Sequence, residues 1–362
     1  MHRFSIRAAL LAAAIVAGLA AATATQAGPS DNRYTVTPLV SDVPGAAPVT
    51  DPNVHNAWGL ARSATSPWWI ADNGTDMTSV YTGAGALVQI GGLNAQAVPG
   101  DPTGAVFSGI AGQFQVGTTA SPTTLGTSNF IFDAEDGTIS AWRNGSTAAL
   151  VKVDMHSAGA VFKGLAISNG TSGPRLYAAN FGEDPGVEVF DGGWNLVNTP
   201  GAFVDPNLPK KFAPFGIQTI GNRIFVTYAK QGEGLDEVDK QGLGIVDAYD
   251  LDGNLLARVA QHGQLNAPWG LAKAPPDFGR FGGDLLVGNF GDGQINAYEE
   301  MPNGHFEHRG LLHAAENGKL VIDGLWALEF GNSGNNGDAQ TLFFTAGPND
   351  EEDGLFGTIK AG

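Results

Sequence analysis

The sequence predicts an all-β fold, a six-bladed β-propeller, from three observations. Glycine accounts for 52 of the 362 residues and charged residues for only 15%, which is typical of short strands joined by tight turns. One apolar phrase recurs six times along the chain. Each copy is followed by further apolar runs with polar turns between them, so the repeating unit matches a propeller blade of about four strands.

The recurring phrase is expected to form the innermost strand of each blade. It is clearest as NAWGLA (56–61) and NAPWGLA (266–272). The positions taken as equivalent are Gly59, Gly104, Gly164, Gly216, Gly270 and Trp326. Glycine at this position lets backbones approach closely near the crowded axis. Trp58, Trp269 and Trp326 are expected at the mouth of the central channel, where they either pack between blades or form a wall for a ligand.

The repeats divide residues 28–362 into a single domain of six blades. The approximate limits of the blades are 50–100, 101–158, 159–205, 206–262, 263–315 and 316–362. The last repeat ends after its third strand, whereas the alternating segment at 33–42 belongs to no repeat. We therefore expect residues 33–42 to add the outer strand of the last blade and close the ring. A solenoid is the main alternative, but its repeats are usually shorter and it leaves residues 33–42 unexplained.

Residues 1–27 have the layout of a signal peptide that is removed on export. Arg3 and Arg7 precede an apolar run that is too short to span a membrane comfortably, and small residues lead to Ala27. We expect a mature chain without a membrane span, monomeric, and located in the periplasm or outside the cell. It has 17 basic and 36 acidic residues, a balance that argues against nucleic acid and anionic membranes as partners.

Six stretches resemble a family of exported bacterial propellers of the NHL-like type. They are NAWGLA (56–61), SPWWIADNGT (66–75), APWGLA (267–272), LLVGNFGDGQINAY (285–298), IDGLWALEFGN (322–332) and LFFTAGPNDEEDGLFG (342–357). The resemblance covers essentially the whole mature chain and implies the fold and export, although the sorting tail of some relatives is missing here. It implies no catalytic residue. The architecture is more distantly similar to gluconolactonase-type hydrolases, streptogramin lyases and strictosidine-synthase-like proteins, an analogy of fold alone.

A ligand is expected on the face that collects the loops before each inner strand and the turns between second and third strands. The ligand-binding candidates there are Asn56, Trp58, Asp72, Asn73, Asp133, Asn180, Lys230, Trp269, Asn289, Asp323 and Trp326. Lys163 and Phe215 lie at the same face in the third and fourth copies of the phrase. Aspartate, asparagine and glycine are also the residues that tight turns require, so a purely structural role remains the alternative for each candidate.

The oxygen-rich character of this face favours Ca²⁺ or Mg²⁺ as a bound ion, and the absence of cysteine excludes thiolate-ligated metals. The metal candidates are Asp72, Asp133, Glu135, Asp350 and Glu351. Two acidic stretches, EGLDEVD (233–239) and NDEEDG (349–354), follow the second strand of their blades and should lie on the same face. Carboxylates packed this closely repel, and a divalent cation would relieve the repulsion. The alternative is a solvated acidic rim.

No catalytic motif is recognisable, since the chain has no GxSxG sequence and its serines carry no triad signature. The sequence therefore predicts a binding or scaffold module for a small molecule, an extracytoplasmic protein or a polysaccharide. The alternative is a hydrolase or lyase that depends on a divalent metal and acts on a small lactone or a carbohydrate-derived substrate.

Overall fold

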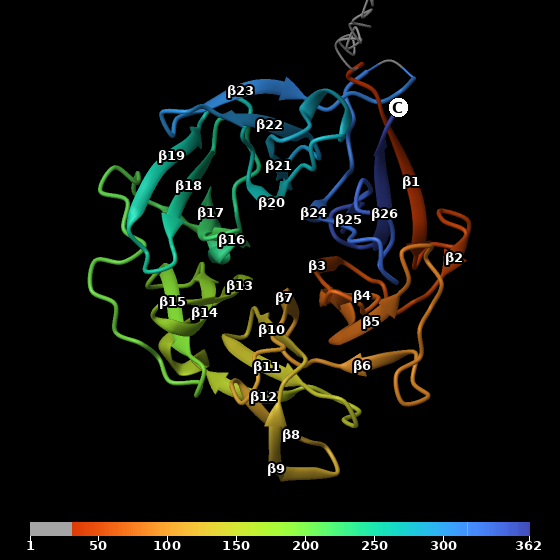
Figure 1. Ribbon diagram of the computed structural model, residues 1–362, viewed down its shortest axis with the longest axis vertical. Coiled ribbons are helices and arrows are strands. Elements are labelled where there is room, and N and C mark those ends of the chain that lie inside the picture. The colour runs from red at the N-terminus through yellow and green to blue at the C-terminus, as the bar shows by residue number, and fades with distance from the viewer. Residues whose placement is uncertain (1–30, 317) are drawn as a thin grey trace, which may run out of the picture. The chain divides into compact units, whose positions relative to one another are not determined.

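The computed structural model describes residues 31–316 and 318–362, and they form a six-bladed propeller (Figure 1). Six sheets surround a central axis, and the chain visits them in order around the ring. The predicted fold class is therefore confirmed. The predicted signal peptide at 1–27 lies outside the described residues. Within the described ranges, no helix is long and apolar enough to cross a membrane.

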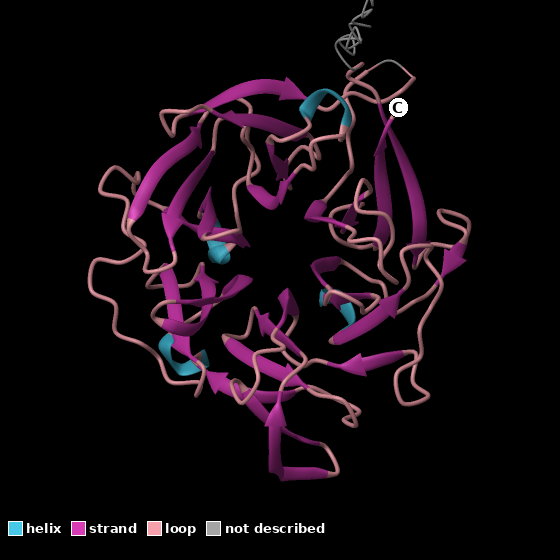
Figure 2. Cartoon of the chain, viewed as in Figure 1, coloured by secondary structure: helices cyan, strands magenta, loops and turns pink. Residues whose placement is uncertain are grey.

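Almost all regular structure is β-strand (Figure 2). Blade 1 consists of β3 (Ala57–Ala61), β4 (Trp68–Asp72), β5 (Met77–Tyr81) and β6 (Ala95–Ala97). Blade 2 consists of β7 (Pro102–Phe107), β10 (Phe130–Ala134), β11 (Thr138–Trp142) and β12 (Leu150–Asp154). Blade 3 consists of β13 (Phe162–Gly170), β14 (Gly173–Asn180) and β15 (Gly186–Asp191). Blade 4 consists of β16 (Phe212–Ile220), β17 (Arg223–Lys230), β18 (Gly244–Asp250) and β19 (Leu255–Gln261). Blade 5 consists of β20 (Pro268–Lys273), β21 (Leu285–Asn289), β22 (Ile295–Glu300) and β23 (Phe306–Leu311). Blade 6 contains β24 (Leu325–Phe330), β25 (Leu342–Ala346) and β26 (Leu355–Ala361).

The remaining elements are short. The 3-10 helices are η1 (Asn73–Thr75), η2 (His156–Ala158), η3 (Glu233–Leu235) and η4 (Gly279–Phe281). A hairpin of β8 (Gln115–Thr118) and β9 (Ser121–Thr127) is inserted between the first two strands of blade 2 and projects from the ring (Figure 1). This hairpin, which the sequence did not predict, explains why the second repeat is the longest.

The N-terminal strand closes the ring, as the unassigned segment at 33–42 predicted. β1 (Tyr34–Ser41) pairs antiparallel with β26, from Tyr34 opposite Ala361 to Ser41 opposite Leu355. A short strand, β2 (Val49–Thr50), adds in parallel to the outside of β1. Blade 6 thus takes its fourth strand from the opposite end of the chain.

All six inner strands share one irregularity at the recurring phrase. The pairing between the first and second strand slips so that two inner residues lie opposite one, which is a β-bulge. The first residues of the six bulges are Trp58, Thr103, Lys163, Phe215, Trp269 and Trp326. The second residues are Gly59, Gly104, Gly164, Gly216, Gly270 and Ala327.

The bulges correct the alignment of the sixth repeat by one residue. The prediction that Trp326 takes the glycine position is wrong, because Ala327 occupies it and Trp326 is equivalent to Trp58 and Trp269. WALE at 326–329 is therefore in register with the phrase WGLA, with alanine in place of glycine and glutamate in place of the final alanine.

The second bulge residue faces the inner strand of the next blade, and the space there differs between blades. A methyl group on Gly59 would overlap the carbonyl oxygen of Thr103 and lie 2.7 Å from the amide nitrogen of Ala105. At Gly164 the nearest atom would be the carbonyl oxygen of Phe215, at 3.1 Å. Apolar clusters fill the wedges between neighbouring blades further out, so the tightest backbone contacts are confined to the axis.

We expect Gly59→Ala to lower the free energy of unfolding by about 1–3 kcal/mol, because the added methyl group meets backbone atoms that cannot move aside. Gly164→Ala is the matched control, and its effect should stay within about 1 kcal/mol, since the looser contact is offset by a stiffer unfolded chain. Urea denaturation of both variants measures the difference. Equal losses would contradict the proposed role of close approach at Gly59.

Candidate functional site

Aromatic side chains from the bulges close the centre of the ring. The indoles of Trp58 and Trp326 are stacked with ring centroids 3.5 Å apart, and both are buried. Trp269 meets them edge-on, at 6.3 and 5.8 Å. Phe290 stacks on the Trp326 ring at 4.0 Å and remains half-buried. These four side chains, here called the aromatic plug, fill the channel mouth rather than surround an open hole.

A chain of polar contacts crosses the plug from blade 6 to blade 4. Asn56 Nδ2 donates to Glu351 Oε2 at 2.6 Å and to Asn73 Oδ1 at 3.1 Å. Asn73 Nδ2 donates to Glu135 Oε2 at 3.1 Å, and Lys163 Nζ donates to Glu135 Oε1 at 2.6 Å. This polar chain links four blades in sequence and reaches a fifth where Lys163 meets the acidic loop of blade 4.

The plug holds the polar chain in place. Trp326 Nε1 donates to Asn56 Oδ1 at 3.1 Å, and Trp269 Nε1 donates to the backbone oxygen of Lys163 at 2.7 Å. The Lys163 ammonium lies 5.0 Å from the centre of the Trp58 ring, a cation–π contact. Each indole therefore fixes one member of the polar chain, which gives the repeated tryptophans a role beyond filling space.

A recess of about 350 Å³ lies beside the polar chain at the channel mouth. Its lining residues are Glu135, Lys163, Asp236, Glu237, Asp239, Phe290, Asp350 and Glu351. The six carboxylates come from the turns between the second and third strands of blades 2, 4 and 6, so alternate blades supply them. Blades 3 and 5 supply the lysine and the phenylalanine. The acidic loops that the sequence predicted on one face do converge there, and we call this site the mouth recess.

Burial and like charges shape the ionisation of the recess. The side chain of Glu237 is 8% exposed, and burial raises its pKa to about 7 although Lys163, 3.9 Å away, lowers it. Glu351 and Asp239 raise that pKa further by repulsion. Burial lowers the pKa of Lys163, but Glu135, Glu237 and Glu351 outweigh it and the pKa is raised overall. The ammonium is therefore held charged among carboxylates that crowd one another.

The loop that carries two of the carboxylates is strained. Asn349, Asp350 and Glu351 have φ values of 61°, 51° and 66°, so three consecutive non-glycine residues adopt the left-handed conformation. Each such residue costs roughly 1–2 kcal/mol relative to a right-handed turn. Strain of this kind collects at sites where the geometry serves a function. Here it places Asp350 and Glu351 over the mouth recess.

Asp133 has a structural partner inside blade 2. Its Oδ1 accepts from the Gly104 amide at 2.6 Å and from Thr103 Oγ1 at 3.0 Å, the two bulge residues opposite it. Thr227 and Thr345 occupy the same position in blades 4 and 6 and satisfy the bulge amides there, at 2.8 and 3.0 Å. The structure therefore places Asp133 in the framework beneath the recess rather than in its lining.

Asp72, Asn180 and Asn289 are equivalent to one another, at the last position of the second strand. The two asparagines order their own loops, since Asn180 Oδ1 accepts from the Gly182 amide at 2.9 Å and Asn289 Nδ2 donates to the Gln264 carbonyl at 2.7 Å. Asp72 is fully buried, and its carboxylate has no hydrogen-bond partner among the described residues. Burial raises its pKa well above the usual range, which favours the neutral acid.

The structure brings together only some of the remaining candidates. Among the metal candidates, Glu135, Asp350 and Glu351 line the mouth recess, whereas Asp72 and Asp133 do not. Lys230 and Asp323 lie outside that lining as well, and Asp323 instead accepts a hydrogen bond from the Asn349 amide at 2.9 Å. No three acidic or histidine side chains of the described residues are grouped as cation ligands.

Phe290 was not predicted from the sequence, and Lys163 was not among the predicted ligand-binding residues. A signal for Lys163 was present, because lysine is the only charged residue at the first bulge position among the six copies of the phrase. Phe290 follows Asn289 in a turn, and nothing in its local sequence reveals that its ring covers Trp326. Its position depends on contacts between segments far apart in the chain.

Comparison with known proteins agrees with the fold. No family model matches the chain. The uncharacterized protein R648 of Acanthamoeba polyphaga mimivirus is 32% identical over 339 residues, which is 89% of this chain and 78% of that protein. Since this relative is viral, the bacterial origin and export implied by the resemblance stay predictions.

Two solved structures share the architecture. A streptogramin B lyase is 11% identical, with 91% of this chain and 98% of that chain covered and a TM-score of 0.52. The soluble aldose sugar dehydrogenase of Escherichia coli is 10% identical, with 91% and 100% covered and a TM-score of 0.54. At these identities the likeness concerns the fold alone. By its sequence, the chain belongs to the family of the mimivirus protein R648.

Proposed function

We propose that the protein is a binding module that holds a small ligand with two or more positive charges, such as an aliphatic polyamine, in the mouth recess. The observation that supports this function is the convergence of six carboxylates from alternate blades around a single buried lysine. A ligand of this kind would neutralise charges that the protein itself leaves unbalanced.

The charge balance of the recess supports a cation. Lys163 is only 5% exposed and is already paired with Glu135 and Glu237. Asp236, Asp239 and Asp350 are exposed at the rim of the recess and form no ion pair with another described residue. Opposite charge brought within about 4–6 Å of such groups favours their ionised form. A bound cation would therefore relieve the repulsion among these carboxylates.

The shape of the recess supports an organic ligand with an apolar portion. Phe290 offers one face of its ring beside the carboxylates while the other lies on Trp326. An aromatic face attracts an ammonium group by roughly 0.5–2 kcal/mol and also accepts methylene groups. The volume of about 350 Å³ falls within the lower part of the range of small-molecule sites.

The alternative is a divalent cation, Ca²⁺ or Mg²⁺, with hydrolase or lyase activity on a small lactone or carbohydrate-derived substrate. Glu135, Asp350 and Glu351, three of the five metal candidates, favour an ion in the same recess. The same binding experiment therefore separates the two proposals.

Spermidine is expected to bind the wild-type protein and to raise its melting temperature, because a ligand that binds only the folded state stabilises it. Asp350→Asn should weaken binding by about tenfold, equivalent to about 1.4 kcal/mol. Asp277→Asn, which removes the same charge at an exposed residue outside the recess lining, is the matched control and should bind as the wild type does. Isothermal titration calorimetry at low ionic strength gives the affinities.

Several outcomes would decide against a polyamine. If Ca²⁺ or Mg²⁺ raises the melting temperature, EDTA reverses the shift and spermidine has no effect, the metal alternative is supported instead. If spermidine binds equally to Asp350→Asn and to the wild type, the charge contacts are adventitious and the proposal fails.

The affinity for spermidine should rise with pH through about 7, because the ionised form of Glu237 attracts a cation and the protonated form does not. Without ligand, the raised pKa of Glu237 predicts the opposite pH trend for the free energy of unfolding. The stabilising contribution of Glu237 is complete below a pH of about 4.5, its pKa in the unfolded chain, and is lost as the pH rises through about 7. Calorimetry and urea denaturation between pH 5 and 8.5 test both trends. Glu237→Gln should flatten each, and unchanged slopes in that variant would exclude Glu237 as the titrating group.

A further inference from the structure

Blade 3 lacks the regular outer strand that the other five blades have. After β15 the chain turns back and begins a fourth strand: the Asp191 amide donates to the Asn195 carbonyl at 2.9 Å, and the Val197 amide donates to the Val189 carbonyl at 2.7 Å. It then leaves the sheet, and the segment up to β16 runs outside the ring as a long loop (Figure 2). Half of the outer edge of β15 is therefore left uncovered.

The uncovered half of β15 has free backbone groups. Amide and carbonyl groups of alternate residues point to the same side of a strand, so those of Val187 face outwards, as those of Val189 and Asp191 do. No hydrogen bond within the described residues satisfies the outward groups of Val187. A strand edge of this kind is a template for pairing with another extended segment.

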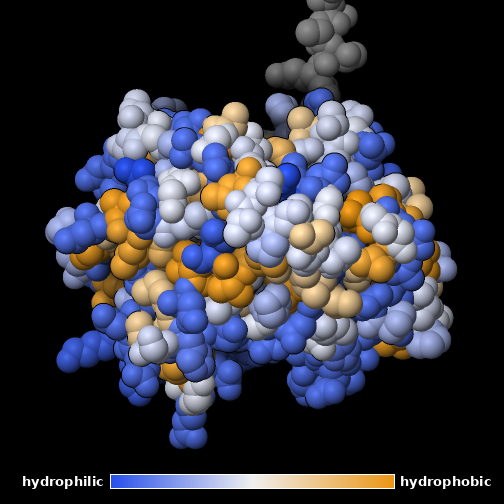
Figure 3. All heavy atoms as spheres, turned by 90° about the horizontal axis from the view of Figure 1, so that it is seen from below, coloured by the Kyte–Doolittle hydropathy of each residue, from blue (hydrophilic) through white to orange (hydrophobic). Residues whose placement is uncertain are grey.

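A groove of about 430 Å³ lies along this edge. Gly186 to Val189 form one wall, Leu196 to Thr199 form the other, and Ala202, Phe203 and Val204 also line it. Leu196 and Val204 are 54% and 55% exposed, although both are large aliphatic residues. On the side of the molecule seen in Figure 3, apolar residues lie in patches between hydrophilic ones.

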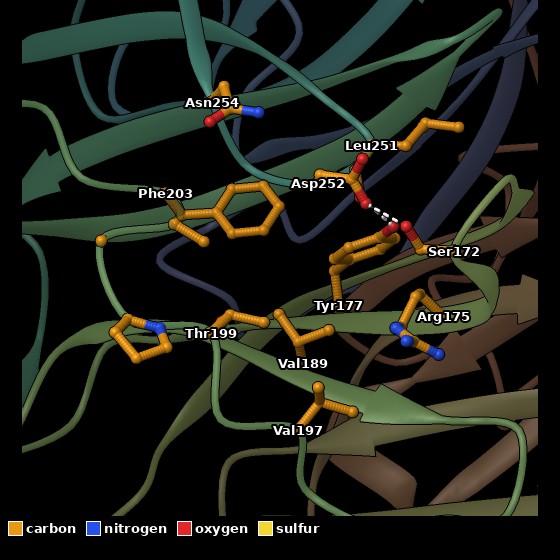
Figure 4. A pocket seen from close by; sticks show the side chains of 13 residues that line it. Ser172, Arg175, Tyr177, Val189, Val197, Thr199, Phe203, Leu251, Asp252 and Asn254 are labelled. Atoms are coloured by element: carbon orange, nitrogen blue, oxygen red, sulfur yellow. Dashed lines mark hydrogen bonds between the residues drawn. The ribbon is translucent and has the colours of Figure 1, made fainter.

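A second cavity of about 370 Å³ adjoins the groove and shares Val189, Val197, Thr199 and Phe203 with it. In Figure 4 the rings of Phe203 and Tyr177 point into this cavity opposite Val189 and Val197. An apolar side chain that enters from the groove would therefore find aromatic and aliphatic walls.

The charges along the edge distinguish β15 from the outer strands of blades 2, 4 and 5. β12, β19 and β23 each carry a basic residue, namely Lys152, Arg258 and Arg309, and basic residues on an edge discourage pairing. β15 carries Glu188 at the groove, with exposed Asp184 close to it in sequence. The whole chain has a net charge of −17, so a second copy of it would be repelled whereas a basic segment would be attracted.

We propose that this groove, the blade 3 groove, binds an extended segment of a partner protein by strand addition, and that the segment has apolar side chains at alternate positions and lysine or arginine beside them. The added strand would complete blade 3 as β1 completes blade 6. Main-chain hydrogen bonds to β15 supply affinity, and the apolar walls select the alternate side chains. The site is separate from the mouth recess and does not depend on the function proposed for it.

The test uses the full chain and a fluorescein-labelled peptide, KVTVTVTVK, followed by fluorescence anisotropy. We expect saturable binding at micromolar concentrations. The charge-reversed peptide EVTVTVTVE should bind at least about tenfold more weakly, and KVTPTVTVK, whose proline removes an amide and breaks the strand, should not bind. Absence of saturable binding of KVTVTVTVK to the folded protein, or equal binding of all three peptides, would overturn the proposal.

Two protein variants locate the site. Leu196→Asn should weaken binding of KVTVTVTVK by about tenfold, whereas Val321→Asn, at a residue that is 56% exposed outside the groove, should leave it unchanged. Both substitutions alter exposed side chains, so both variants should retain the melting temperature of the wild type. Equal affinities of the two variants would overturn the assignment. A concentration-dependent dimer in sedimentation that Leu196→Asn abolishes would identify a second copy as the occupant and would also overturn it.

Discussion

The close approach of six inner strands around one axis is the constraint on which the rest of the structure depends. Glycine at the second bulge position permits it in five blades, and alanine suffices in the sixth, at Ala327. The bulge inserts one residue that has no partner of its own in the second strand. Four of the six residues so inserted are aromatic, and three of them, all tryptophans, join Phe290 in the plug that closes the centre.

The plug in turn makes a buried lysine possible at the mouth. An ammonium group removed from water is stable only if charges and hydrogen bonds replace the lost hydration. Lys163 obtains these from Glu135 and Glu237, while the neighbouring indoles hold its backbone and one face of its side chain. The tryptophans that close the centre of the ring therefore also hold a residue of the mouth recess in place. The carboxylates of blades 2, 4 and 6 collect around this one cation, and the same three blades carry a side chain that satisfies the bulge amide.

Local sequence was sufficient for the fold, because the repeated phrase and the turn residues report short-range pairing within each blade. The segment at 33–42, which belongs to no repeat, revealed the long-range pairing with β26 that closes the ring. Local sequence misaligned Trp326 because a tryptophan is a stronger signal than the alanine beside it. Local sequence could not show that Asp133 and Glu135, two residues apart, have different roles. Asp133 lies in β10 against the bulge of blade 2, whereas Glu135 follows that strand and lines the mouth recess. The contact of Asn56 with Glu351 joins residues 295 positions apart, and only closure of the ring creates it.

Closure also has a consequence for the order of events during synthesis. Tyr34 is made long before its partner Ala361, which lies more than 300 positions later in the chain. At about 5–20 residues per second a ribosome takes tens of seconds to make the chain between them. Throughout that time the edge of β1 that pairs with β26 has no partner, and the wedge between blades 6 and 1 stays open to water. β1 contains a proline, Pro38, at the position where its pairing with β26 is irregular. A proline in an exposed strand removes a backbone amide and so discourages pairing with a wrong partner.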